Sequence, residues 1–77
     1  MKLGLGYRHA VKRPGSEPYC FTDKTEEFRS LAHASQTAKR RALENGAQSV
    51  LIWDDATFKD LSIWWLVDGE WEETPLH

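Results

Sequence analysis

The dipeptide Asp68-Gly69 is the feature that most constrains how this 77-residue chain can fold. It separates the apolar run 61–67 from the short run 70–73. Asp-Gly in such a position favours a two-residue type I′ turn, which joins two antiparallel strands in a hairpin. The turn also sets the register, and it pairs Val67 with Glu70, Leu66 with Trp71, Trp65 with Glu72 and Trp64 with Glu73.

Apolar side chains occupy both faces of this predicted hairpin, because side chains alternate along a strand. One face carries Trp64, Leu66 and Trp71. The run 49–53 repeats the pattern, with Val50 and Ile52 on one parity and Leu51 and Trp53 on the other. One helix covers one face of a sheet, so the second apolar face is expected to bind a partner or a second copy. The alternative is that long connections fold over this face and bury it. The pattern leaves open which of the two faces is free. The other hairpin face carries Leu61, Ile63, Trp65 and Val67, together with Glu70 and Glu72.

The rest of the chain supplies further strands and one helix. Residues 2–11 predict a strand in which Gly4 and Gly6 face something that approaches closely. Residues 12–18, with two prolines and a glycine, predict a loop, and residues 19–22 a short strand. A helix is predicted through 35–45 and ends at Gly46, a favoured residue after a helix. Further strands are expected at about 48–54, 61–67 and 70–73.

The start of that helix has two readings. In the first, Asp23 or Thr25 caps a helix that begins near Glu26. In the second, residues 26–32 form a strand and Ser35 caps a shorter helix. The first reading has a buried stripe of Phe28, Leu31, Ala34, Ala38 and Ala42.

These elements predict a single α+β domain spanning residues 1–77, with an antiparallel sheet of four to five strands and one α-helix packed on one face. A chain of this length buries a modest core, which its nine aromatic residues, four of them tryptophan, help to fill. Dimerisation is a natural supplement to so small a core.

No catalytic residues, cofactor or metal site are expected. The acids are dispersed, the serines lie in no nucleophile elbow, and Gly4-Leu5-Gly6 lacks the third glycine of a nucleotide motif. The histidines and the single cysteine, Cys20, lack metal-ligand spacing, and one cysteine forms no intramolecular disulfide. No apolar run is long enough to cross a membrane, so we expect a cytoplasmic protein.

Two sets of residues are candidates for binding. The apolar set, expected to contact a protein partner, is Trp53, Trp64, Leu66 and Trp71. The basic set, expected to contact phosphates, is Lys12, Arg13, Lys39, Arg40 and Arg41. The alternative for the helical cluster is a solvated helix end favoured by the helix dipole.

Four segments also carry a resemblance. These are the small-residue basic helix 35–42 (SQTAKRRA), the strand 49–52 (SVLI), the apolar run 61–67, and Asp68-Gly69-Glu70-Trp71. The region from Phe28 to Glu73 thereby resembles small sheet-plus-helix proteins of phages and mobile elements, in particular a β-rich class of type I-F anti-CRISPR proteins. The resemblance implies five antiparallel strands, one helix and a stoichiometric inhibitor in the nucleic-acid path of a CRISPR surveillance complex. It would place Lys39, Arg40 and Arg41 at the contact.

The chain departs from that class in its many tryptophans and its acidic end. Residues 54–73 hold seven acids against Lys59 alone, so this end could imitate DNA toward a basic protein. We therefore expect a non-catalytic inhibitor from a phage or mobile element that binds a host protein or nucleoprotein in the host cytoplasm. The alternatives are a nucleic-acid-binding module whose tryptophans stack on bases, and a structural homodimer paired through its second sheet face.

Overall fold

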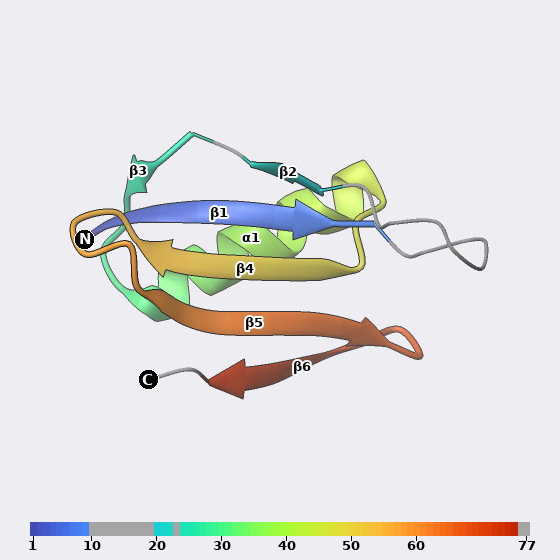
Figure 1. Cartoon of the computed structure of the whole chain (residues 1–77). Helices are drawn as coiled ribbons and strands as arrows, with labels where there is room; N and C mark the ends of the chain where they lie inside the picture. The colour runs from blue at the N-terminus through green and yellow to red at the C-terminus, as the bar shows by residue number, and fades with distance from the viewer. Residues whose placement is uncertain (10–19, 23, 76–77) are drawn as a thin grey trace.

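The computed structural model describes residues 1–9, 20–22 and 24–75, and the predicted loop 12–18 lies outside them. Strands and one helix follow one another along the chain (Figure 1). Their bounds are β1 Lys2–Arg8, β2 Cys20–Thr22, β3 Glu26–Glu27, α1 Leu31–Asn45, β4 Ser49–Asp54, β5 Asp60–Val67 and β6 Glu70–Pro75.

The strands form one antiparallel sheet in the spatial order β2-β1-β4-β5-β6. The short strands β2 and β3 both pair with the edge of β1 that β4 leaves free, so together they occupy one position in the sheet. The sheet is therefore five positions wide and carries a single helix within the described residues. This confirms the predicted α+β class with an antiparallel sheet.

Helix α1 packs on β1 and β4, and Figure 1 shows it behind these two strands while the β5–β6 hairpin extends past it. The helix contributes small buried side chains, which let its backbone lie close to the sheet. The fully buried strand residues Leu5, Val50 and Ile52 face it. The core consists of Leu3, Leu5, Tyr7, Phe28, Ala34, Ala38, Ala42, Ala47, Val50 and Ile52.

The helix begins at Leu31, so both predicted starts are wrong. Ser30 is the N-cap, and its Oγ accepts a hydrogen bond from the His33 backbone N–H at 3.1 Å. Residues 26–27 cannot be helical because they pair with β1 as β3. Ser35 lies inside the helix, where its hydroxyl donates to the Leu31 carbonyl at 2.9 Å. The predicted end is correct, since Gly46 adopts the left-handed conformation at φ 72°.

The predicted hairpin register is confirmed at all four pairs, from Val67 opposite Glu70 to Trp64 opposite Glu73. Asp68 and Gly69 both have positive φ, at 50° and 82°, as a type I′ turn requires. The ladder continues two pairs further, to Pro75 opposite Ser62.

One residue of β5 departs from the predicted alternation. The pairing of β4 with β5 shifts between Ile52 and Trp53, because Ile52 pairs with Ser62 whereas Trp53 pairs with Asp60. The extra residue in this bulge is Leu61, which packs against the core cluster and not with Ile63.

Candidate interaction surface

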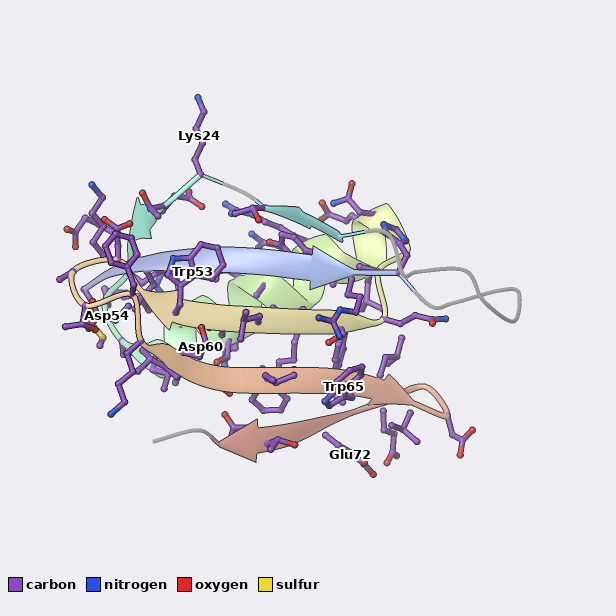
Figure 2. The ribbon with its side chains drawn as sticks, viewed as in Figure 1. Lys24, Trp53, Asp54, Asp60, Trp65 and Glu72 are labelled. Carbon is purple, nitrogen blue, oxygen red and sulfur yellow. The ribbon has the colours of Figure 1, made fainter. Side chains whose placement is uncertain are left out.

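The sheet face opposite α1 carries a row of apolar side chains that no described element covers. We call it the open face and define it by Leu51, Trp53, Ile63, Trp65 and Val67. Trp65 and Val67 are 40% and 43% exposed. In Figure 2, Trp53 and Trp65 both lie in front of the sheet, on the side away from the helix.

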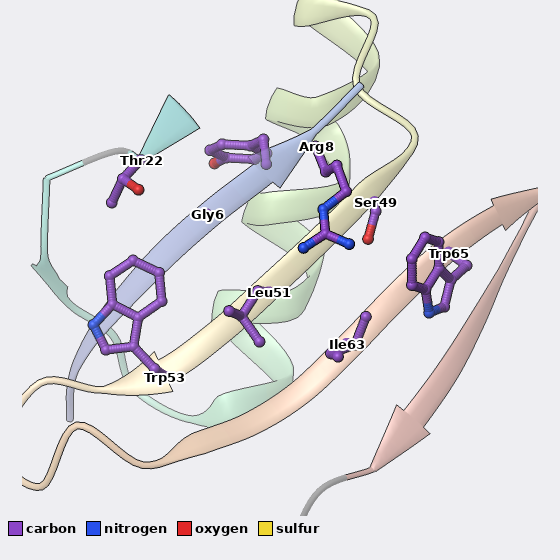
Figure 3. Close-up of a pocket in the computed structure, with 9 residues that line it drawn as sticks. Gly6, Arg8, Thr22, Ser49, Leu51, Trp53, Ile63 and Trp65 are labelled. Atoms are coloured by element: carbon purple, nitrogen blue, oxygen red, sulfur yellow. The ribbon is translucent and has the colours of Figure 1, made fainter. Parts of the chain in front are cut away.

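A shallow hollow of about 170 Å³ lies in the middle of the open face. Figure 3 shows Trp53 and Trp65 at its two ends, with Leu51 and Ile63 between them and Arg8 beside Ser49. Gly6 and the buried Ser49 also line the hollow. The open face therefore combines two aromatic walls with a low centre.

The indole of Trp53 lies against the backbone of β1. A Cβ atom added at Gly4 would stand 2.0 Å from Trp53 Cε2, and one added at Gly6 would stand 3.2 Å from Cζ3. The sequence-based expectation that these glycines face a close approach is thus confirmed, and the approaching group is Trp53. This contact with β1 restricts the positions that the ring can take.

Charged side chains border the open face on opposite sides. The register makes Arg8, Ser49, Trp65 and Glu72 successive cross-strand neighbours on β1, β4, β5 and β6. With neighbouring strands about 4.8 Å apart, Arg8 and Glu72 are separated by about 14 Å along this row. The described residues give neither of them an ion-pair partner within the chain.

The other two tryptophans belong to the helix side of the sheet, where they pack against the core. Trp64 Nε1–H donates to Ser35 Oγ at 3.3 Å, and Lys39 Nζ lies 4.0 Å from the centre of a Trp64 ring. Beside them, a groove of about 340 Å³ runs between α1 and the β5–β6 hairpin, and Glu73 also lines it.

The four apolar residues predicted to bind a partner therefore do not share one face. Trp64, Leu66 and Trp71 lie on the helix side, whereas Trp53 lies on the open face. The division follows from the pairing of Val50 with Trp64 and of Leu51 with Ile63, which the hairpin turn alone does not determine. The predicted set omitted Ile63, Trp65 and Val67, although the alternation along β5 had already placed them on one face.

The basic residues of the helix are not brought together either. Lys39 stacks on Trp64, Arg40 is exposed, and Arg41 forms a two-pronged salt bridge with Glu26. Hydrogen bonding from Arg41 lowers the pKa of Glu26, and the same bond raises the pKa of Arg41. Successive helix residues point about 100° apart, so three in a row cannot form one stripe. Lys12 and Arg13 lie outside the described residues.

The described residues hold no group of three or more side chains placed to ligate a metal. His33 Nδ1 is buried and has no hydrogen-bond partner among the residues that the structure describes. Its ring lies edge-on to Phe28, with centres 5.6 Å apart. The 15-residue helix in the described part of the chain is too short and too polar to cross a membrane.

Comparison of the chain with protein-family models, curated proteins and solved structures gives no match. Inference about function therefore depends on the surface and on the sequence pattern.

Proposed function

We propose that this chain is a small non-catalytic binding protein whose recognition surface is the open face. The observation that carries the proposal is an apolar sheet face, bearing two tryptophans, that no described element covers. Contiguous apolar patches on small soluble domains usually mark interaction sites, and tryptophan is prominent among residues that carry binding energy.

The physical properties of the open face suit a protein partner. Complete burial of a large apolar side chain contributes roughly 2 kcal/mol relative to exposure. Trp53 is already held against Gly4, so little side-chain freedom remains to be lost when a partner docks. The hollow between Trp53 and Trp65 offers space for one protruding side chain of that partner.

The biological role that we propose is inhibition of a host protein or nucleoprotein by a protein from a phage or mobile element. The support is the resemblance of residues 28–73 to a class of type I-F anti-CRISPR proteins. A small domain that acts by occupancy fits such a role. The site of action would be the host cytoplasm.

Nucleic-acid binding is a second candidate, because Arg8 lies beside the aromatic hollow and could meet a phosphate while bases stack on Trp65. The acidic border formed by Glu70 and Glu72 opposes that reading, as does the net charge of −2. Lys39 and Arg41 are also engaged within the chain. A gel-shift titration at low salt tests this candidate, and absence of any shift rules it out.

Capture from host lysate tests the proposal about the open face. The wild type should retain a host protein that Trp65→Ser loses. Phe58→Ser is the matched control, since Phe58 is 80% exposed in the turn between β4 and β5 and outside the open face. Both variants should keep the wild-type circular dichroism spectrum. Equal capture by all three proteins would show that the open face is not the recognition surface.

The proposed inhibitory role has a direct assay. Purified chain is added to a type I-F surveillance complex, and binding of target DNA is measured. We expect loss of DNA binding near equimolar chain and recovery with Trp65→Ser. Unchanged DNA binding at a large excess of chain would exclude this target.

A further inference from the structure

One row of residues across the open face would complement the same row of a second copy laid in the opposite direction. Arg8, Ser49, Trp65 and Glu72 follow one another across four strands. The row has a cation at one end and an anion at the other. Its inner positions hold a small residue, Ser49, and a large one, Trp65. When two such rows lie against each other in opposite directions, each charged residue faces one of opposite charge, and Trp65 faces Ser49.

A two-fold axis performs that reversal when two copies face each other. If the axis lies between the sheets and runs parallel to the strands, it reverses the order across the sheet but keeps each residue's level along the strands. Two sheets commonly pack face to face with their strands within about 30° of each other. A two-fold interface brings each contact twice, so every complementary pair counts double.

We infer that a second copy of this chain docks on the open face, with Arg8 opposite the partner's Glu72 and Trp65 over the partner's Ser49. Trp65 of each copy then enters the hollow of the other, which Leu51 and Ile63 line and in which Ser49 is 5% exposed. The next row supports the same arrangement. Leu51 and Ile63 are cross-strand neighbours, so Leu51 of one copy would face Ile63 of the other.

The interface is small, and this sets its strength. Four strands of six residues offer a footprint of roughly 400 Å² per copy. The total for two copies, roughly 800 Å², lies below the range of standard specific complexes and corresponds to weak, reversible association. The inference rests on the proposed function in one respect, namely that the open face docks proteins. A self-paired copy would have to separate before a foreign partner could bind there.

Charge reversal tests the inference, with sedimentation equilibrium over a concentration series as the measurement. The wild type should show a mass above 8.9 kDa that rises with concentration. Arg8→Glu and Glu72→Arg should each weaken association about tenfold, because like charges then meet twice. Arg40→Glu, the same change at an exposed helix position, should leave the association unchanged.

Mixing the two single variants gives the decisive result. In the mixed pair, the carboxylate introduced at position 8 of one copy meets the guanidinium introduced at position 72 of the other. The two unchanged side chains, Glu72 of the first copy and Arg8 of the second, also carry opposite charges, so association should return. A wild-type mass of 8.9 kDa at every concentration would overturn the inference. A dimer unaffected by the single changes, or a mixture that stays monomeric, would do the same.

The same measurements separate this inference from the proposed function. Lysate capture by a strictly monomeric protein would leave the proposed function standing and remove the self-association. A dimer that captures nothing would remove the proposed function alone.

Discussion

On the helix side of the sheet, Leu5, Val50 and Ile52 are fully buried, whereas on the open face Trp65 and Val67 keep 40% and 43% of their surface exposed. Both faces are built by the same strands, and adjacent residues such as Leu51 and Ile52 belong to different faces. Hydrophobicity alone therefore does not tell which apolar residues stabilise the fold. The side that α1 covers decides it, and the other side stays partly exposed.

The difference between the two faces is tested most directly by the same substitution, isoleucine to alanine, on each face. Ile52→Ala should lower the free energy of unfolding by about 3 kcal/mol, because it leaves a cavity in the core. Ile63→Ala, on the open face, should cost about 1 kcal/mol because the site is already partly open to water. Urea unfolding measures both values. Equal losses would mean that the open face is as well packed as the core.

The close contact between β1 and Trp53 gives the next largest effect. Gly4→Ala should destabilise the fold by about 2 kcal/mol, since the added methyl group would overlap the indole ring. Gly6→Ala is the control, because its methyl group would stand 3.2 Å from the ring and require a shift of a few tenths of an ångström. Thermal unfolding should therefore rank Gly4→Ala well below Gly6→Ala. The reverse order would show that Trp53 does not lie where the structure places it.

A substitution in the turn between β5 and β6 should have a smaller effect on stability. Gly69→Val should destabilise the domain by about 1 kcal/mol or more, because a β-branched residue is strained at φ 82°. Gly69→Asn should destabilise the domain less, because asparagine tolerates positive φ. If the melting temperature of Gly69→Val equals that of the wild type, the β5–β6 turn is not type I′.

The smallest effect concerns the edge of the sheet, where Arg41 holds Glu26. The lowered pKa of Glu26 means that its ionised form stabilises the fold above its unfolded pKa. This contribution disappears as pH falls through the lowered folded pKa. Both side chains are partly exposed, so Glu26→Gln should cost only a few tenths of a kcal/mol at pH 7. The difference from wild type should vanish once the pH lies below the lowered folded pKa, and a difference that persists in strong acid would disprove the linkage.

Much of the fold could be predicted because its signals are local. Asp68-Gly69 fixes a turn and a register within ten residues, and Gly46 marks the end of the helix. The beginning of the helix could not be predicted in the same way. Residues 26–27 are strand only because β1 lies beside them, and that pairing joins segments distant in sequence.

The sequence predicts an apolar interaction surface on the sheet, but it does not assign the correct residues to one face. Alternation along β5 shows that Trp64 and Trp65 lie on opposite faces, yet it does not show which face the helix covers. That choice depends on the pairing of β4 with both β1 and β5, which puts Val50, Ile52 and Trp64 on the side of α1. The position of each tryptophan along its strand therefore indicates the candidate surface better than the number of tryptophans does.

The contact between Gly4 and Trp53 also restricts the order in which this chain can change over generations. A side chain at position 4 meets the indole at once, whereas loss of the indole first leaves room for that side chain. The two positions are thus a pair in which one order of substitution passes through a strained intermediate and the other does not. Relatives of this chain that carry a larger residue at position 4 should already have lost the tryptophan at position 53.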